Sequence, residues 1–292
     1  MHLACGFTAI LITVALVAVL ANGGLLSQAI GAVLGAVGLG FWFHFVYLFE
    51  HEAAHYNLAR SRQANDRLTN LFIGTLIGED IRRYRPVHLA HHKWLGTTMD
   101  TERSYFDPLN LRFVVESLLG VRATRVLLQR DQLSRAVEAT NGSDAAVGAG
   151  SGSGYLNGTF ARAAAVHAAI VIGALAVNEA AVAVAWVLGF LIFLPTFNAV
   201  RQVLEHRDGD ADPSVDYRVV PHGAVNRLFG AGPLGLTLGG AGFNRHLLHH
   251  WMPQVSYTRL GELEAFLRET ELEPVLAERT TTYGRALVRI AG

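Results

Sequence analysis

Two stretches of the chain contain neither lysine nor arginine, and each holds a pair of long apolar segments. Residues 1–59 include Leu3–Ala21 and Leu25–Phe49, and the second stretch includes Ala163–Val177 and Ala180–Val200. A helix needs about 20 predominantly apolar residues to cross a bilayer. The pattern therefore predicts an all-α membrane protein with four transmembrane helices arranged in two hairpins.

A secretory signal peptide and the buried helices of a soluble protein are the alternatives to membrane spans. Leu3–Ala21 has no basic segment before it and is longer than the apolar core of a signal peptide, which favours a span. Soluble proteins carry roughly a quarter of charged residues, whereas this chain is 16% charged and 51% hydrophobic. The composition therefore favours a membrane protein over a soluble one.

The 24 basic residues fall in two blocks, Arg60–Arg162 and Arg201–Arg289, which two hairpins would place on the same side of the membrane. Because loops rich in lysine and arginine stay on the cytoplasmic side, both termini are predicted to be cytoplasmic. Lys93 is the single lysine, an arginine bias typical of high-GC bacteria, so we expect a bacterial inner membrane. A formal net charge of zero gives no reason to expect a nucleic-acid partner.

These features divide the chain into five segments. We expect a first transmembrane hairpin in 1–59, a cytoplasmic region in 60–140, a flexible Gly/Ser-rich connector in 141–158, a second transmembrane hairpin in 159–200, and a second cytoplasmic region with an amphipathic C-terminal helix in 201–292. The two cytoplasmic regions would together form a helical cap beside the membrane.

Nine of the 13 histidines lie in tight groups at the predicted cytoplasmic ends of the spans. "HEAAH" places two histidines four residues apart, and "HLAHH" and "HLLHH" share the spacing i, i+3, i+4, which puts side chains on one side of a helix. Imidazole nitrogens suit zinc, copper, iron and nickel, and nine of them are too many for one ion. The sequence thus predicts a site in the cap for two metal ions, with nine candidate ligands: His51, His55, His88, His91, His92, His206, His246, His249 and His250.

"HEAAH" also fits the zinc-protease motif H-E-x-x-H, whose glutamate acts as a general base. An intramembrane zinc protease would need a further ligand, such as an aspartate in an apolar span, and Ala163–Val200 contains no aspartate. A metal transporter is a second alternative, but transporters place polar residues near the bilayer midplane, where these spans are apolar. Cys5 is the single cysteine, which excludes a disulfide within the chain and any cysteine-rich metal site. Both alternatives explain fewer of the histidines than a two-metal site does.

The three histidine motifs, in this order on two membrane hairpins, resemble those of the integral-membrane fatty acid desaturase and hydroxylase superfamily. The flanking segments "RRYRPVHLAHHKWLGTTMDTE" and "FNRHLLHHWMPQVSYTRLGELEAFL" are similar too, and the resemblance covers nearly the whole chain. It implies two non-haem irons held by the histidines of the three motifs, with His206 as the ninth ligand. It also implies that Gln202, one turn before His206, holds a metal-bound water.

The resemblance further implies an O2-dependent oxidation of an unactivated C–H bond, with iron supplying the reactivity and the protein the geometry. We expect desaturation of a fatty acyl or other lipid-like chain that enters between the spans. Hydroxylation or ketone formation, on a lipid or a carotenoid, is the alternative within the same superfamily, and the sequence leaves that choice open.

The electrons for such a reaction would come from a separate carrier, a ferredoxin or a similar protein, together with its reductase. The chain has no H-P-G-G haem motif and no C-x-x-C motif, so no electron-transfer domain is fused to it. Four basic residues beside the second histidine motif could form the docking patch: Arg82, Arg83, Arg85 and Lys93. The alternative is that they bind lipid headgroups or pair with acidic neighbours.

Polar residues close to the histidines in sequence are candidates for holding the ligands in place through hydrogen bonds. They are Glu50, Glu52, Asp100, Glu205 and Asn244. Trp42 and His44 are predicted to line the substrate tunnel, because His44 precedes His51 by two helical turns; a histidine satisfied inside the helix bundle is the alternative. His167 is expected to be structural, and the sequence leaves the role of His222 open.

Overall fold

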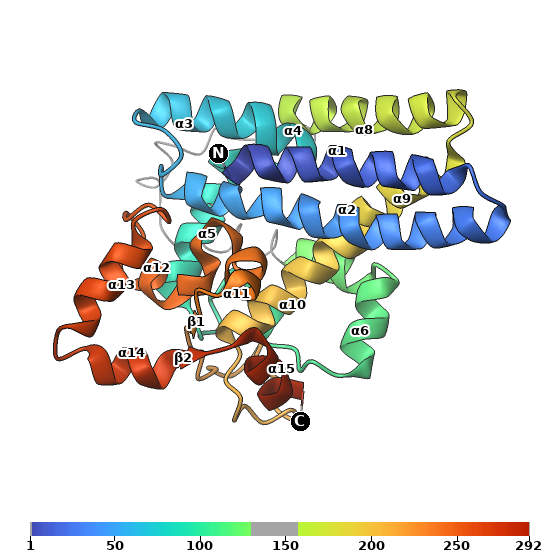
Figure 1. Ribbon diagram of the computed structural model, residues 1–292. Helices are drawn as coiled ribbons and strands as arrows, with labels where there is room; N and C mark the ends of the chain where they lie inside the picture. The colour runs from blue at the N-terminus through green and yellow to red at the C-terminus, as the bar shows by residue number, and fades with distance from the viewer. Residues whose placement is uncertain (1, 130–156, 292) are drawn as a thin grey trace.

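The computed structural model describes residues 2–129 and 157–291, and it shows an all-α membrane protein (Figure 1). Four helices are long and apolar enough to cross a membrane. They are α1 (His2–Ala21), α2 (Leu25–Ala54), α8 (Gly158–Ala176), and a continuous helix made of α9 (Ala180–Leu188), the π-helical turn η4 (Gly189–Phe193) and α10 (Leu194–His206). The four predicted spans are thus present. The predicted connector 141–158 lies outside the described residues except for its last two.

Two of the spans extend beyond the apolar segments that predict them. α2 runs past Phe49 to Ala54, so the first histidine motif lies at the end of this helix, and His55 is the residue that follows it. α8 begins at Gly158 rather than Ala163, because the side chain of Asn157 accepts hydrogen bonds from the amides of Thr159 and Phe160 and caps the helix. The third span therefore has 19 residues, enough to cross a bilayer.

Glycines bring α2 and the fourth span into close contact. A Cβ atom on Gly40 would lie 2.2 Å from Cβ of Phe193, and one on Gly189 would lie 2.9 Å from Cβ of Leu39. Small residues let helix backbones approach closely where both helices are apolar. This crossing carries α10 past α2, so that the ends of the second and fourth spans meet on one side of the molecule.

The remaining elements lie mostly at that end of the spans (Figure 1). In the first half they are α3 (Arg62–Leu68), the π-helical turn η1 (Thr69–Ile73), α4 (Gly74–Ile77), α5 (Ile81–Trp94), η2 (Arg103–Tyr105) and α6 (Leu111–Leu118). After α10 they are β1 (Leu228–Phe229), α11 (Pro233–Leu238), η5 (Gly240–Arg245), α12 (His246–Trp251), α13 (Leu260–Arg268), α14 (Glu273–Arg279), β2 (Thr280–Thr281) and α15 (Tyr283–Ala291). β1 and β2 form a short parallel pair, with Leu228 opposite Thr280.

The C-terminal tail, for which an amphipathic helix is predicted, is divided into short helical segments. It consists of three short helices, α13, α14 and α15. Pro274 is the second residue of α14. Proline has no amide proton and is tolerated in the first turn of a helix but not in its interior, so a helix begins here rather than continuing from α13. The extended pair Thr280–Thr281 then separates α14 from α15. These two breaks, which apolar periodicity does not register, set the ends of the helices in the tail.

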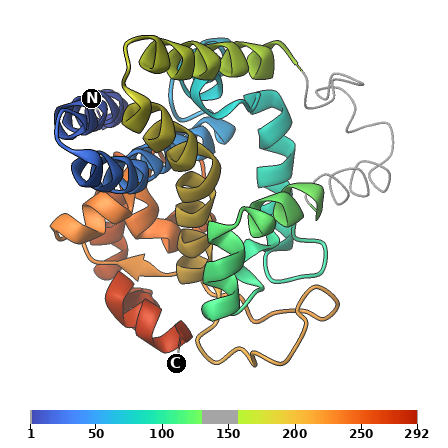
Figure 2. The same cartoon turned by 90° about the vertical axis from the view of Figure 1, so that its right-hand side faces the viewer.

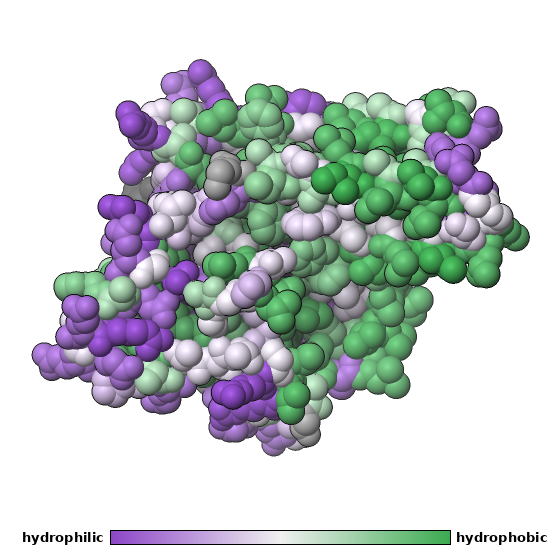
Figure 3. Space-filling view, in the orientation of Figure 1, coloured by the Kyte–Doolittle hydropathy of each residue, from purple (hydrophilic) through white to green (hydrophobic). Residues whose placement is uncertain are grey.

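α6 lies in the region predicted to be cytoplasmic, but it packs beside the fourth span (Figure 2). A Cβ atom on Gly120, just after α6, would lie 3.7 Å from Cδ1 of Ile192, in the middle of that span. The outward face of α6 is apolar, with Leu111 78% and Leu119 70% exposed. In Figure 3 the hydrophobic surface covers the spans and α6, whereas hydrophilic residues gather over α13 and α14.

Candidate metal centre

The first histidine motif lies at the end of α2, where the chain reverses direction. His51 is in the last turn and His55 is the residue at which the helix ends. The reversal needs a left-handed backbone at Tyr56, whose φ is 63°, a conformation that costs a residue with a side chain roughly 1–2 kcal/mol. The guanidinium of Arg85 lies 3.9 Å from the centre of the Tyr56 ring and helps to hold it.

The second motif lies on α5, which begins at a capped turn where Asp80 accepts a hydrogen bond from the amide of Arg82. His88 and His92 are one turn apart and lie on the same side of this helix. His91 is offset from His92 by about 100° around the axis. The two adjacent histidines of the motif therefore face different neighbours.

The third motif forms the short helix α12 and follows a kink in η5. Ala241 and Gly242 both have positive φ there, 54° and 82°. A Cβ atom on Gly242 would lie only 2.6 Å from Cβ of Tyr257, so this turn requires glycine. The kink sets the direction of α12, on which His246 and His250 share one side and His249 has another.

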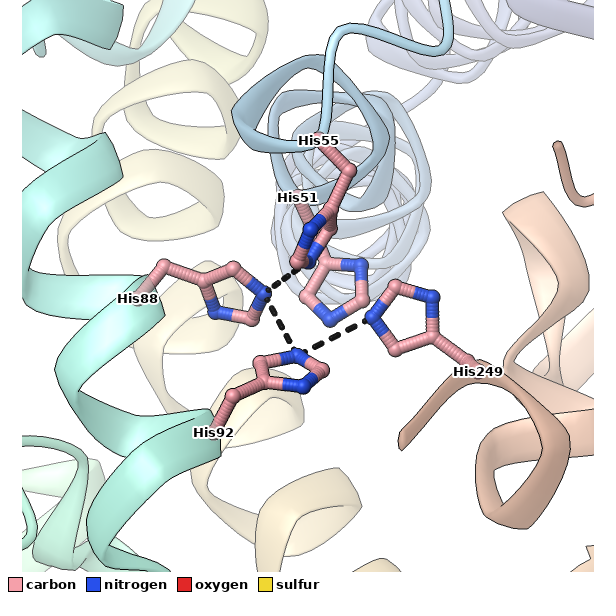
Figure 4. Close-up of side chains that lie close together, drawn as sticks. All are labelled: His51, His55, His88, His92 and His249. Carbon is pink, nitrogen blue, oxygen red and sulfur yellow. Dashed lines mark hydrogen bonds between the residues drawn. The ribbon is translucent and has the colours of Figure 1, made fainter. Parts of the chain in front are cut away.

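Five imidazoles from three helices meet in one group, which we name the first cluster (Figure 4). The Nε2 atom of His88 lies 2.9 Å from that of His55 and 3.0 Å from that of His92. The Nε2 atom of His249 lies 3.1 Å from that of His92. One nitrogen from each member lies within 4.8 Å of the others; the members are His51, His55, His88, His92 and His249.

Four further imidazoles form a second cluster around His206, at the end of α10. The Nε2 atom of His206 lies 3.3 Å from that of His91 and 3.0 Å from that of His246, which in turn lies 3.1 Å from that of His250. The rings of His92 and His250 stack at 4.2 Å and connect the two clusters. All nine predicted ligands are therefore accounted for, five in one cluster and four in the other.

The chemistry of both clusters fits metal ions. A neutral imidazole has one N–H and one lone pair, so Nε2 atoms converging in this way cannot all satisfy one another by hydrogen bonding. In the first cluster, both ring nitrogens of His51 are buried without a hydrogen-bond partner. Burial lowers the pKa of His55 to about 3 and that of His249 well below its usual value. These rings are thus neutral at physiological pH, which is the form that binds metals.

Asp100 orients a ligand candidate of the second cluster. Its Oδ1 lies 2.8 Å from Nδ1 of His91, and its Oδ2 accepts a 2.5 Å hydrogen bond from the hydroxyl of Tyr105. Burial alone would lower the pKa of His91, but the Asp100 carboxylate outweighs burial and raises it. A carboxylate on the far ring nitrogen is the usual way to hold a ligating histidine in place.

Glu52 and Glu205 each reach a histidine of the third motif. Oε1 of Glu52 lies 3.5 Å from Nδ1 of His249, and its Oε2 accepts a hydrogen bond from the amide of Tyr257. Oε2 of Glu205 lies 3.7 Å from Nε2 of His246 and 2.5 Å from Nη1 of Arg201. Glu205 is close enough to His206 and His246 to act as a ligand itself, a possibility that the sequence analysis did not consider.

Glu102 is the residue at this site that the sequence analysis missed. Its Oε1 lies 3.4 Å from Nδ1 of His88, and its Oε2 accepts a 2.9 Å hydrogen bond from Nε2 of Gln202. It therefore links the second histidine motif to α10. The sequence "TMDTE" places it two residues after Asp100, and a second acidic residue at that distance was the available signal.

Two polar residues of the earlier predictions do not join the clusters. Asn244 is buried, but none of the described residues accepts a hydrogen bond from its Nδ2 atom. Its expected contact with a histidine is therefore absent. His222 packs against Tyr105 and Tyr217, with ring centres 5.7 and 4.4 Å apart, and belongs to neither cluster. As expected, His167 is structural, because its ring bonds both the Leu76 carbonyl oxygen and the indole of Trp186.

A cavity of about 350 Å³ lies beside the clusters, between α2, α5, α6, α8 and α10. Tyr47, one helical turn before His51, and Asn198, one turn before Gln202, contribute to its wall, and Phe160, Phe190 and Leu194 make much of the wall apolar. Trp42 and His44 do not line it. Trp42 packs on Phe41 and Phe45, and His44 is buried near Phe197. The tunnel expected beside these two residues therefore differs from the cavity observed.

The four basic residues of the predicted docking patch do not form one surface. Arg85 is buried, pairs with Asp66 at 2.5 Å and bonds the Ala53 and Ala54 carbonyl oxygens. Arg83 lines the cavity. Arg82 and Lys93 are exposed but stand at opposite ends of α5. Arg85 cannot contribute to a docking contact, since its buried guanidinium already binds Asp66 and these two carbonyl oxygens.

Comparison with known proteins gives one match. The family model described as fatty acid desaturase matches residues 27–282. This region includes all nine clustered histidines and three of the four spans. No curated protein and no solved structure matches the chain.

Proposed function

The chain belongs to the fatty acid desaturase family, which implies an oxidoreductase, and from this premise we propose an O2-dependent desaturase with two non-haem irons. Its substrate would be a fatty acyl or other lipid-like chain, into which it introduces a double bond. The observation that carries the proposal is the division of nine imidazoles, each buried or partly buried, into two clusters joined by the stacked rings of His92 and His250.

Each cluster would hold one ion. Imidazole is a good ligand for iron, and the first cluster offers five such rings and the second four. When bound, the irons would supply the O2 chemistry that removes hydrogen from an unactivated C–H bond. The chain's own contribution is to hold the rings through Asp100, Glu52 and Glu102 and to keep water away by burying them.

The cavity beside the clusters is the proposed position of the lipid-like chain. Its volume of about 350 Å³ and its apolar wall suit an alkyl chain. Tyr47 precedes His51 by one helical turn and Asn198 precedes His206 by two, so the cavity approaches the clusters from the side of the spans. A substrate could therefore enter it from the bilayer without crossing water.

The zinc-protease alternative has less support. Its general base would be Glu52, but the carboxylate of Glu52 accepts hydrogen bonds from Asn57 and from the amide of Tyr257 and faces His249. It is fully buried rather than open to a peptide. His51 and His55 also belong to a group of five imidazoles, more than a zinc protease uses.

We also propose that both termini face the cytoplasm, in the inner membrane of a bacterium. The arginine-rich segments lie at the ends of the spans opposite to the two turns that join them, which matches the bias of cytoplasmic loops. A separate electron carrier, with its reductase, would then dock from the cytoplasm near the exposed end of α5, where Lys93 lies beside His92.

The test is the metal content and the products of the detergent-purified full chain after expression with added iron. We expect two metal ions per chain, about one in His55→Ala and about one in His206→Ala, with no turnover in either variant. His2→Ala removes an exposed histidine outside the clusters and should keep both ions. One zinc per chain, insensitive to His206→Ala, would overturn the proposal.

The products separate the two reactions of the superfamily. Cells expressing the chain should accumulate unsaturated lipid, seen by mass spectrometry as the loss of two hydrogens per chain. Products that gain oxygen instead would favour the hydroxylase or ketolase alternative while leaving the two-metal site intact.

A further inference from the structure

A second cavity, of about 370 Å³, opens at the surface where α3, η1, the start of α5 and the first turn of α8 meet. It contains none of the clustered histidines. Its wall consists of Asp66, Arg67, Asn70, Leu71, Asp80, Arg82, Gly158, Thr159 and Arg162. Three arginines therefore line one cavity.

The two aspartates in the wall do not neutralise these arginines. Asp66 pairs with Arg85 at 2.5 Å, outside the set. The side chain of Asp80 accepts hydrogen bonds from Asn70, from Thr159 and from the amide of Arg82. Within the described part of the chain, Arg67, Arg82 and Arg162 form no ion pair with any carboxylate. The cavity therefore presents an uncompensated positive charge.

One of the three arginines is already held in position. Arg162 donates hydrogen bonds to the Asn70 carbonyl oxygen at 2.9 Å and to Oγ1 of Thr75 at 3.0 Å. A fixed guanidinium loses less conformational freedom on binding than a mobile one. Arg67 and Arg82 are exposed in the wall of the cavity, so their side chains can move to meet a ligand. The arrangement suits an anion with several acceptor oxygens, such as a phosphate group.

The position of the cavity identifies the source of that phosphate. It lies at the first turn of α8, where the third candidate span begins. Leu71 in its wall is 55% exposed, and the neighbouring Phe72 is 48% exposed. An exposed apolar surface next to arginines at the end of a span matches the boundary between lipid chains and headgroups.

We propose that this cavity binds the phosphate group of an anionic membrane phospholipid, with the lipid chains lying against Leu71 and the outer face of α8. The proposal does not depend on the reaction at the histidine clusters. Of the roles that the sequence leaves open for Arg82, docking an electron carrier, pairing with an acidic neighbour or binding a lipid headgroup, it assigns the last.

Native mass spectrometry of the detergent-purified full chain tests it, with phosphatidylglycerol as the probe. Diacylglycerol, which has the same chains and no phosphate, is the comparison lipid. We expect phosphatidylglycerol adducts on the wild type and few diacylglycerol adducts. In Arg67→Gln/Arg82→Gln the affinity for phosphatidylglycerol should fall on the order of 10-fold or more, since each arginine near a membrane surface contributes substantially to anionic-lipid binding.

The matched control is Arg60→Gln/Arg285→Gln, which removes two exposed arginines outside the cavity and should leave the adducts unchanged. Equal loss in both double variants would show a general charge effect and overturn the site, as would full retention in Arg67→Gln/Arg82→Gln. A third measurement adds inorganic phosphate. If it displaces the lipid completely and itself depends on Arg67 and Arg82, the phosphate site stands but its assignment to a lipid does not.

Discussion

Nδ1 of His91 and Oδ1 of Asp100 lie 2.8 Å apart, and both side chains are buried. Because an ionised carboxylate can only accept hydrogen bonds, His91 carries its proton on Nδ1. Its lone pair is then on Nε2, the atom that faces His206 in the second cluster. One hydrogen bond thus decides which nitrogen of His91 is available to a metal.

Asp100→Asn should weaken metal binding at the second cluster. Asparagine keeps the size of the side chain but removes the charge that holds the His91 proton, and changes of this kind cost metal sites about 10- to 100-fold in affinity. Titration of the purified chain with a chelator should release one ion at lower chelator concentration than in the wild type. Asp210→Asn, whose exposed carboxylate pairs with Arg289, is the control. Unchanged release in Asp100→Asn would contradict the role given to this carboxylate.

Glu102→Gln should lower turnover by about 10-fold, because it weakens the contacts with both His88 and Gln202. Gln202→Leu breaks the same link from the other side. If the two residues act as a unit, the double variant should lose little more activity than the worse single variant. Glu271→Gln, an exposed acid far from the clusters in sequence, should change nothing. Fully additive losses would indicate two independent roles.

Arg122→Met should destabilise the region around α6. The Arg122 guanidinium is 2% exposed, pairs with Asp107, bonds the Ser104 carbonyl oxygen and lies 3.9 Å from the Phe113 ring. The variant leaves the Ser104 carbonyl oxygen without this donor, whereas Asp107 keeps its ion pair with Arg218, so we expect a cost of about 1–3 kcal/mol. The apparent unfolding midpoint in detergent should fall by several degrees.

The control for that measurement is Arg112→Met. Arg112 pairs with Glu116 on the surface, with 78% of its side chain exposed, and exposed ion pairs contribute little to stability because water screens them. Equal shifts in the two variants would contradict the structural role of Arg122.

His222 should make the protein less stable in mild acid. Burial, with a smaller contribution from Arg207, lowers the pKa of His222 from 6.5 to about 4. The unfolded chain therefore takes up a proton at higher pH than the folded one, so this residue's contribution is complete above pH 6.5 and is lost as the pH falls to about 4. In His222→Phe the unfolding midpoint should fall less between about pH 7 and about pH 5 than in the wild type. A parallel fall in both proteins would contradict this pKa.

Much of the fold could be predicted from the sequence. Membrane spans depend on local hydropathy over about 20 residues, and all four were found, although α8 begins five residues earlier than its apolar run. The sequence is less informative where packing or a single residue overrides the average hydropathy or periodicity of a segment. Pro274 and Thr280–Thr281 divide the tail into short helices. α6 lies against the fourth span although its eight residues are too few to be recognised as a span from the sequence.

The nine candidate ligands were also determined by the sequence, because their spacing puts them on common helix faces at the ends of spans. Their distribution was not. His91 and His92 are adjacent in the chain but belong to different clusters, and His249 separates from His246 and His250 in the same way. Neighbours on a helix point about 100° apart, and what each then meets depends on how α2, α5, α10 and α12 cross. The same crossing brings Glu102 to Gln202, 100 residues along the chain, a contact that only the tertiary structure decides.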